Sequence, residues 1–305
     1  MSLGSFGYLS YLKSNSPTPT EPIYNTELPQ IIEEERETSQ DAERFNILLM
    51  GHGGAGHSGG GLMDAIIVVS VNITDKKATV ISVPRDLYFS GHKINADPSI
   101  RDAIAAVTGL FISNQITIDF DNFIKMIDSL DGITVDVKKA YIDNYYPVRG
   151  KENELCGFSN EKIEEVHRLY SGFELEKQFT CRYETISYGL GFHQMSGDEA
   201  LKYVRSRHGD GDFARSMRQF EVLKAILQKG NVAAVSKAFA FVKTDLNIDS
   251  VNELLEKIAN PLEYSVSYLG LSDQNVLQNS KSSQGAYILL PKSGVDIKTY
   301  IKSQI

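Results

Sequence analysis

Three apolar runs near the start of the chain, each rich in β-branched residues, restrict the fold more than any other feature. They are FNILLMG (45–51), DAIIVVSV (64–71) and KATVISVP (77–84). Runs of this length and composition are typical of buried strands. The turn sequence NITDK between the last two predicts a hairpin. The folded part is therefore expected to begin near residue 45 with strands of a central sheet.

Helical periodicity follows these strands. Apolar residues recur at spacings of three and four within 119–131, and Asp119 is the expected N-cap of that helix. The remaining predicted helices are 99–108, 196–205, 212–229, 231–241 and 250–259, and the remaining strands are 133–137, 264–270 and 286–290. The segment 139–185, rich in Tyr and charged residues, is expected to be an irregular insertion. Together these elements predict an α/β, three-layer α-β-α domain over 45–305, with a central mixed sheet and helices on both faces.

Residues 1–44 differ from the rest, with eight acidic residues against three basic ones. This composition is typical of a disordered segment or linker. Its opening SFGYLSYL is either the stub of a hydrophobic anchor or vector-derived sequence. No run approaches 18 consecutive apolar residues, so no part of the sequence given is expected to span a membrane. Cys156 and Cys181 would pair in an oxidising compartment and be unrelated thiols in the cytosol.

The strongest chemical signal is a cluster of arginines in the stretch YVRSRHGDGDFARSMRQFEVL. Residues 201–230 hold seven Lys/Arg against three Asp/Glu, whereas the whole chain carries a net charge of −8. Such local concentration on an acidic protein favours a specific anion and disfavours a nucleic-acid surface. Arginine's planar fork suits paired phosphate or carboxylate oxygens. The alternative is a solvated helix face with salt bridges to Glu199 or Glu221.

The spacing within this stretch predicts how the arginines converge. Arg205 and Arg207 are two apart, so an extended backbone would place both on one side. Asp212 is the expected N-cap of the next helix. On that helix Arg215, Arg218, Gln219 and Val222 share one face, and Phe220, Leu223 and Leu227 form the adjoining core stripe.

Other candidate residues lie where strands begin or end. The loop Gly51–Ser58 nearly spells a P-loop, but His57 occupies the lysine position and a strand follows it, not a helix. We expect a loop near a ligand, which His52 and His57 contact unless they are merely exposed. Asp64 begins a strand and is either a turn former or a Mg²⁺ ligand. Arg85 and Asp86 follow a strand that Pro84 ends, at the edge where α/β folds place their ligands.

Five ordered motifs resemble the LytR–CpsA–Psr family of bacterial cell-envelope enzymes. They are FNILLMG, LMDAIIVVSVNITDKKATVISVPRDLYF, KINA (93–96), DFDNFIKMIDSLDGITVDV and SGDEALKYVRSRHGDGDFARSMRQFEVL. The resemblance runs from about residue 45 to 230, with a weaker match beyond. It implies a Mg²⁺-dependent phosphotransferase that moves a glycopolymer from a polyprenyl-pyrophosphate carrier to a peptidoglycan or other cell-wall acceptor. It also implies an apolar lipid pocket between sheet and helices, and an extracytoplasmic domain held by an N-terminal membrane anchor.

Carried over residue by residue, the resemblance implies a defined site. Its expected catalytic residues are Arg85, Asp86, Arg205, Arg207 and Arg215; its substrate-binding residues are Lys93, Asn95, Asp212, Arg218 and Gln219; and its metal ligand is Asp64. In this arrangement the arginines other than Arg218 clamp phosphate, Gln219 orients an oxygen, and Asp64 or Asp86 serves as the base.

Two departures from the family pattern affect the metal site. The family's loop aspartate is replaced in Gly51-His52-Gly53, and its R-S-D-T motif becomes Leu62-Met63-Asp64-Ala65. His52, His57 or Asp86 would have to substitute for the second ligand. Two alternative functions follow: a pyrophosphohydrolase of polyprenyl-pyrophosphate lipids, and a non-catalytic module that binds polyprenyl lipid or polysaccharide.

Overall fold

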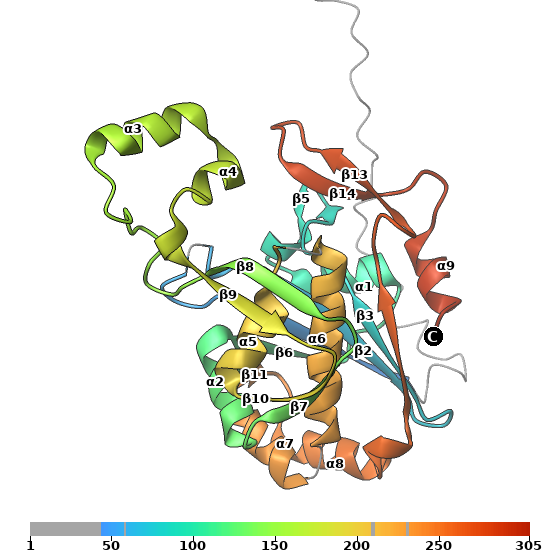
Figure 1. Cartoon of the computed structure of the whole chain (residues 1–305). Coiled ribbons are helices and arrows are strands. Elements are labelled where there is room, and N and C mark those ends of the chain that lie inside the picture. Colours follow the sequence, from blue (N-terminus) through green and yellow to red (C-terminus); the bar gives the residue numbers. More distant parts are fainter. Residues whose placement is uncertain (1–43, 58, 209–210, 230–231) are drawn as a thin grey trace, which may run out of the picture.

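The computed structural model describes residues 44–57, 59–208, 211–229 and 232–305 (Figure 1). The strands are β1 (Arg44–His52), β2 (Met63–Asn72), β3 (Lys77–Ser82), β4 (Tyr88–Phe89), β5 (His92–Lys93), β6 (Asn114–Asp119), β7 (Ile133–Val137), β8 (Tyr141–Pro147), β9 (Tyr183–Tyr188), β10 (Gly191–Met195), β11 (Lys243–Thr244), β12 (Ser265–Gly270), β13 (Leu277–Lys281) and β14 (Tyr287–Pro291). The α-helices are α1 (Ile100–Thr108), α2 (Phe120–Ser129), α3 (Asn160–Leu169), α4 (Gly172–Glu176), α5 (Gly197–Arg205), α6 (Gly211–Gln228), α7 (Val232–Phe239), α8 (Ile248–Ile258) and α9 (Ile297–Lys302). The expected linker over 1–44 lies outside the described residues except for Arg44, the first residue of β1. In the described part of the chain no helix is long and apolar enough to cross a bilayer.

A mixed sheet of six strands forms the centre, in the order β11-β6-β1-β2-β3-β12. The predicted hairpin of β2 and β3 is confirmed, as is the strand before it, which pairs antiparallel with β2. β6 pairs parallel with β1, and β12 pairs parallel with β3. β1, β3, β6 and β12 therefore run in one direction, and their carboxyl ends meet at one edge of the sheet.

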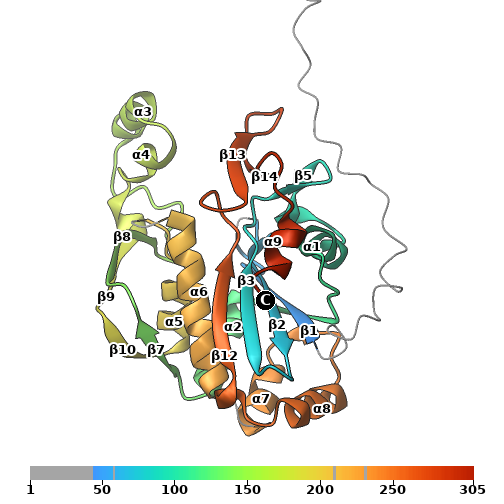
Figure 2. The ribbon, with the colours of Figure 1, turned by 90° about the vertical axis from the view of Figure 1, so that its right-hand side faces the viewer.

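One face of this sheet is closely packed. Figure 2 shows α1 and α9 together on this side. Leu48 and Met50 of β1 point to it with Ile66 and Val68 of β2, and all four are at most 4% exposed. Ile104 and Ile301 supply fully buried side chains from the two helices. Alternation of buried residues along β1 follows the period of two of a strand.

A second core lies on the other side of the molecule, where α2, α5 and α6 pack on the inner side of the small antiparallel sheet of β7 and β10 (Figures 1 and 2). Asp119 caps α2 as predicted, with its side chain accepting a hydrogen bond from the Asn122 backbone. The expected α/β domain, with a central mixed sheet between helices, is confirmed. The expected lipid pocket remains a prediction.

Between the central sheet and this second core, apolar side chains are less closely packed. Ile47 and Leu49 of β1, Val69 of β2 and Ile116 of β6 share this face and are each half-buried. On the same face Ile67 of β2 and Val80 of β3 are buried, so the gap in cover is limited to the part around β1 and β6. Among the described residues of β1, β2, β3 and β6, Ile118 is the one whose side chain packs against the second core. This face of the sheet is thus apolar but incompletely covered.

We expected the segment 139–185 to be irregular, and this prediction is wrong. β8 and β9 pair antiparallel and carry an arm, defined here as residues 148–182, in which α3 and α4 project from the body (Figure 1). The strand was missed because β8 turns Tyr141 and Asp143 inward while Ile142 is 58% exposed. Its inward positions therefore do not follow an apolar alternation.

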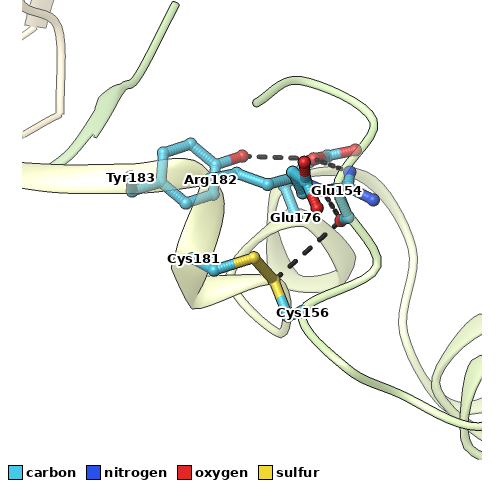
Figure 3. Close-up of a disulfide and its surroundings, with 6 residues drawn as sticks. All are labelled: Glu154, Cys156, Glu176, Cys181, Arg182 and Tyr183. Carbon is cyan, nitrogen blue, oxygen red and sulfur yellow. Dashed lines mark hydrogen bonds and ion pairs between the residues drawn. A yellow bond between two sulfur atoms is a disulfide. The ribbon is translucent and has the colours of Figure 1, made fainter. Parts of the chain in front are cut away.

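Cys156 and Cys181 form a disulfide at the base of the arm, with their Cα atoms 5.5 Å apart (Figure 3). This resolves the alternatives left open by the sequence in favour of pairing. Arg182, next to Cys181, donates to the Glu154 carbonyl at 2.8 Å and pairs with Glu176 at 3.2 Å. Both ends of the arm are therefore joined by covalent and polar contacts.

Candidate functional site

The candidate site lies at the sheet edge where the parallel strands end. β2 begins there with Asp64 in its second position, and β3 ends there just before Arg85 and Asp86. β14 closes the same region, because the Leu289 backbone N–H donates to the Asp86 carbonyl at 2.9 Å. This edge is the expected location of ligands in open α/β sheets.

Alternating charges connect four of the predicted site residues. Arg85 Nη1 lies 2.5 Å from Asp64 Oδ1, and Arg85 Nε lies 3.6 Å from Asp86 Oδ2. Asp86 Oδ1 in turn accepts from Lys93 Nζ at 2.5 Å. Asn95 is buried nearby, and its backbone N–H donates to the Arg85 carbonyl at 3.4 Å. Asp86, whose side chain is only 13% exposed, thus holds both cations in place.

Arg85 retains unused capacity to bind an anion. Its Nε is buried and has no hydrogen-bond acceptor among the described residues. The Arg85 side chain as a whole is 25% exposed and lines the pocket, so an incoming phosphate can approach its guanidinium group.

A pocket of about 300 Å³ opens beside Arg85. Asp64 and Asp86 line it from the sheet edge, and Arg215 and Gln219 line it from α6. Five of the predicted site residues, from three separate segments, are therefore brought to one cavity. Arg205, Arg207, Arg218, Lys93 and Asn95 are not among its lining residues.

The arginine face of α6 is turned inward. Arg215 is 8% exposed and Arg218 4%, so the alternative of a solvated helix face is wrong for both. Arg218 Nε donates to the Tyr203 carbonyl at 3.0 Å and Nη2 donates to the Ser206 carbonyl at 2.5 Å. Its guanidinium also stacks over the Tyr141 ring, with Cζ 4.1 Å from the centroid. Arg218 thus joins α6 to the segment after α5.

Two details of α6 differ from expectation. Phe220 and Leu223 are half-buried and Leu227 is 38% exposed, so the expected core stripe is less buried than the arginine face. The reason is that Arg218 satisfies its donors on carbonyls and stacks on an aromatic ring, which permits burial.

The helix α6 also begins at Gly211, so Asp212 lies inside its first turn and is not the N-cap that we expected. The Asp212 side chain lies outside the described residues.

Arg205 and Arg207 flank Ser206, which is buried while both arginines are half-buried. Arg205 stacks over Phe120 at 4.2 Å and donates to the Tyr146 hydroxyl at 3.3 Å. Burial raises the pKa of Tyr146, and the charge of Arg205 opposes that shift. Arg205 is thus held by two aromatic rings.

A buried carboxylate organises the residues that follow. Asp143 is fully buried and accepts hydrogen bonds from the Ser206 hydroxyl, from the His208 backbone N–H at 3.3 Å and from the Tyr145 backbone N–H at 2.8 Å. The His208 Nδ1 lies 3.5 Å from its Oδ1. Asp143 therefore fixes the backbone that carries Arg205 and Arg207.

The glycine-rich loop connects β1 to β2 and opens no helix, as predicted. His52 Nδ1 lies 2.9 Å from the Gly60 carbonyl and 3.1 Å from the Gly54 N–H, so it closes the loop on itself. His57 meets the Phe120 ring edge-on, with centroids 5.2 Å apart. Gly54 has φ of 80°, and a Cβ there would lie 3.0 Å from the Asp119 Cβ, so the loop packs tightly on the start of α2.

The side chains present fit Mg²⁺ only as a partial ligand set. No three His, Cys, Asp or Glu side chains of the described residues gather in a metal-binding group. Asp86 is engaged by Lys93, and His52 Nδ1 by its own loop. Asp64, with a side chain 39% exposed and one oxygen on Arg85, lines the pocket with coordinating capacity left, and the exposed Asp273 is a further carboxylate of the same pocket. Mg²⁺ accepts such an arrangement when phosphate and water complete its shell.

Sequence reasoning missed the aromatic part of the site. Phe213, Tyr268 and Tyr287 line the pocket together with Asp273. Phe120 and Tyr146 hold Arg205. Phe213 lies within the arginine motif and Phe120 directly follows β6, but neither position was recognised as part of the site. The abundance of Tyr in 139–185 could have indicated only Tyr146.

Comparisons with known proteins place the chain among relatives. The chain matches the LytR_cpsA_psr family over residues 18–293. It is 24% identical over 242 residues to the polyisoprenyl-teichoic acid–peptidoglycan teichoic acid transferase TagT of Bacillus subtilis, covering 74% of this chain and 65% of the relative. TagU of the same organism is 26% identical over 265 residues, covering 82% and 75%. The chain thus spans about two thirds of the TagT sequence.

Solved structures share the fold. The crystal structure of B. subtilis TagV superposes with a TM-score of 0.61 at 22% identity, covering 86% of this chain and 95% of that one. A LytR-CPS2A-psr family protein, YwtF (TagT), with bound octaprenyl pyrophosphate lipid, superposes with a TM-score of 0.56 at 21% identity, covering 88% and 91%. At these identities the likeness establishes the architecture.

Proposed function

Because this chain belongs to the LytR–CpsA–Psr family, we propose that it is a phosphotransferase acting on lipid-linked glycopolymers. It would move a glycopolymer from a polyprenyl-pyrophosphate carrier to a sugar of peptidoglycan or another cell-wall polymer, forming a phosphodiester. The observation that carries this proposal is the convergence of Arg85 and Arg215 on one pocket from opposite structural elements. Two guanidinium groups facing one cavity suit a ligand with two adjacent phosphates.

The incompletely covered face of the sheet supports a lipid carrier. Ile47, Leu49, Val69 and Ile116 are half-buried apolar residues between the sheet and the helices of the second core. A polyprenyl chain placed against them would bury apolar surface at roughly 25 cal/mol per Å². The apolar lipid pocket would thus begin beside the charged mouth at Arg85.

The reaction follows from the charges at this mouth. The acceptor hydroxyl oxygen attacks the phosphorus that carries the glycopolymer, and the bond from that phosphorus to the bridging oxygen breaks. Prenyl phosphate leaves with the bonding electrons, and the hydroxyl proton passes to a carboxylate, Asp64 or Asp86. Arg85 and Arg215 stabilise negative charge on the phosphate oxygens, and Gln219 orients one of these oxygens. In this proposal Arg205 and Arg207 add positive charge to the clamp.

Asp64 would hold Mg²⁺ together with the substrate phosphates. The cation would supply additional positive charge where the pyrophosphate bond breaks. The ion pair with Arg85 suits this role, because it holds the Asp64 carboxylate at the pocket.

The disulfide supports a location outside the cytoplasm. A bond between Cys156 and Cys181 forms and persists in an oxidising compartment. The proposed domain therefore acts on the outer side of the cytoplasmic membrane, where cell-wall acceptors lie. A membrane anchor at the N-terminal end, ahead of the described residues, remains a prediction.

A labelled lipid-linked donor, incubated with and without an acceptor oligosaccharide, tests the proposal. Transfer of label to the oligosaccharide is the expected result, with Arg207→Ala and Arg85→Ala each lowering the rate at least about tenfold. Phe192→Ala, at a side chain 78% exposed on β10, is the matched control and should leave the rate unchanged. Release of label at the same rate without acceptor would indicate a pyrophosphohydrolase. Lipid binding with no turnover would indicate a binding module.

A further inference from the structure

Two large aromatic side chains stand at the rim of the pocket without being buried. Phe213, in the first turn of α6, is 54% exposed, and Tyr287, the first residue of β14, is 49% exposed. Both line the cavity that contains Arg85 and Arg215. Tyr268 lies between sheet and helix at the same pocket, and its ring meets the Phe213 ring edge-on at 6.2 Å.

The Tyr287 ring is fixed although it is exposed. Its hydroxyl donates to Asn279 Oδ1 at 2.7 Å, and Asn279 Nδ2 donates to Asp273 Oδ2 at 2.9 Å. Asp273 itself lines the pocket. These hydrogen bonds restrict the Tyr287 side chain, which costs conformational entropy, and they leave the apolar face of its ring in water. A ligand that covers the ring would offset that cost.

The chemistry of this rim matches a sugar ring. A pyranose presents C–H groups on its faces and hydroxyl donors around its edge. The faces of aromatic rings carry the negative part of the quadrupole and attract such C–H groups. A carboxylate beside them accepts hydroxyl donors. A mostly apolar wall with a few placed polar groups is typical of ligand sites that select orientation.

We propose that Phe213, Tyr287 and Asp273 form a saccharide subsite that binds the sugar ring next to the phosphate clamp. The inference rests on the proposed function and extends it to substrate recognition. Its ligand is a hexose or N-acetylhexosamine ring, and this ring belongs either to the lipid-linked donor or to the acceptor glycan.

Isothermal titration with three probes tests the subsite. The probes are farnesyl pyrophosphate, farnesyl-pyrophosphoryl-N-acetylglucosamine, and the N-acetylglucosamine oligomer chitotetraose added with farnesyl pyrophosphate present. Tyr287→Leu and Phe213→Leu remove the rings and keep apolar volume, whereas Tyr287→Phe keeps the ring. Phe192→Ala, at an exposed ring on β10, is the matched control. Thermal unfolding verifies that every variant folds.

The subsite predicts that both leucine variants weaken a sugar-bearing probe about fivefold or more and leave farnesyl pyrophosphate within about twofold. Tyr287→Phe retains most of the affinity. A loss confined to the lipid-linked sugar assigns the ring to the donor, and a loss confined to chitotetraose assigns it to the acceptor; either supports the proposal. Unchanged affinity for both sugars, or an equal loss for farnesyl pyrophosphate, overturns it. Arg85→Ala distinguishes failure of the saccharide subsite from failure of the proposed function. If this variant binds farnesyl pyrophosphate as tightly as the wild type does, the proposed function itself is contradicted.

Discussion

His208 and Phe173 lie face to face, with ring centroids 4.5 Å apart and ring planes 3° apart. Phe173 belongs to α4 in the disulfide-linked arm, whereas His208 directly follows Arg207 in the segment that carries Arg205 and Arg207. Tyr145 meets both rings edge-on, at 5.5 Å and 6.4 Å. The arm therefore packs directly against the segment that presents two of the proposed phosphate-binding arginines.

Removing this stack should weaken the proposed site without unfolding the domain. We expect Phe173→Ala to lower affinity for a prenyl pyrophosphate about two- to tenfold, because an aromatic pair contributes roughly 0.5–1.5 kcal/mol to holding the segment. Hydrogen exchange at residues 205–208 should speed up in parallel. Leu169→Ala, 56% exposed on the same arm, is the control. Identical affinity and exchange in the two variants would contradict this coupling.

The disulfide should stabilise the arm more than the domain. Replacing Cys156 and Cys181 by serine removes a link across a separation of 25 residues, worth roughly 3 kcal/mol in the chain-entropy view. We expect faster proteolysis and hydrogen exchange within α3 and α4, with the protection of β1–β3 preserved. Wild-type protein under reducing conditions should behave like the double variant. Unaltered protection of α3 in both samples would show that the polar contacts of Arg182 suffice.

A capping box at the start of α5 predicts a pH dependence of stability. The Ser196 N–H donates to Glu199 Oε2 at 2.9 Å, and the Glu199 N–H donates to Ser196 Oγ at 3.4 Å. Hydrogen bonds from the backbone and hydroxyl of Ser196 hold the pKa of Glu199 below its ordinary value. A lowered folded-state pKa means that the carboxylate stabilises the fold above the unfolded-state pKa, about 4.3, and that this is lost as pH falls through the folded-state pKa.

Glu199→Ala should therefore lower the free energy of unfolding by about 1 kcal/mol at pH 7. The difference from wild type should shrink as the pH falls below about 4. Glu199→Gln keeps a neutral capping acceptor, so it should retain most of the stability with a weaker pH dependence. Urea unfolding between pH 7 and pH 3 measures all three proteins. If the difference in the free energy of unfolding between wild type and Glu199→Ala stays constant over this pH range, the Glu199 carboxylate is not the source of the pH dependence.

The partial ligand set at Asp64 predicts that Mg²⁺ and lipid bind together. Titration of Mg²⁺ alone should show weak binding, and prenyl pyrophosphate should strengthen it, because phosphate oxygens complete the shell. Asp64→Asn should abolish that enhancement. Asp75→Asn, in the β2–β3 turn, is the matched control. Tight Mg²⁺ binding without lipid, or full activity of Asp64→Ala in EDTA, would show that the metal is held elsewhere or is not required.

Features set by local pattern were predictable from the sequence. β1, β2 and β3 are continuous apolar runs, and Asp119 caps α2 as its position indicates. Asp64 and Arg85 were identified because they adjoin strand ends. Each of these depends on residues close in sequence or on the shared edge of one sheet.

Features set by distant contacts were not predictable. β8 escaped recognition because it buries Asp143, whose partners Ser206 and His208 lie more than 60 residues away. The sequence likewise did not show that the arginine face of α6 is buried, because burial of Arg218 depends on carbonyls of the preceding segment and on the Tyr141 ring.

The pocket's aromatic rim was unpredictable for the same reason. It joins α6 to β14, which are far apart along the chain. No pattern within either element indicates that Phe213 and Tyr287 share one cavity.

A crystal structure of the protein with a bound prenyl pyrophosphate tests the central claim most directly. The account predicts that the diphosphate contacts Arg85 and Arg215, and that the prenyl chain lies between the central sheet and α6 against Ile47 and Leu49. A diphosphate bound away from Arg85, or a prenyl chain lying outside that space, would contradict it.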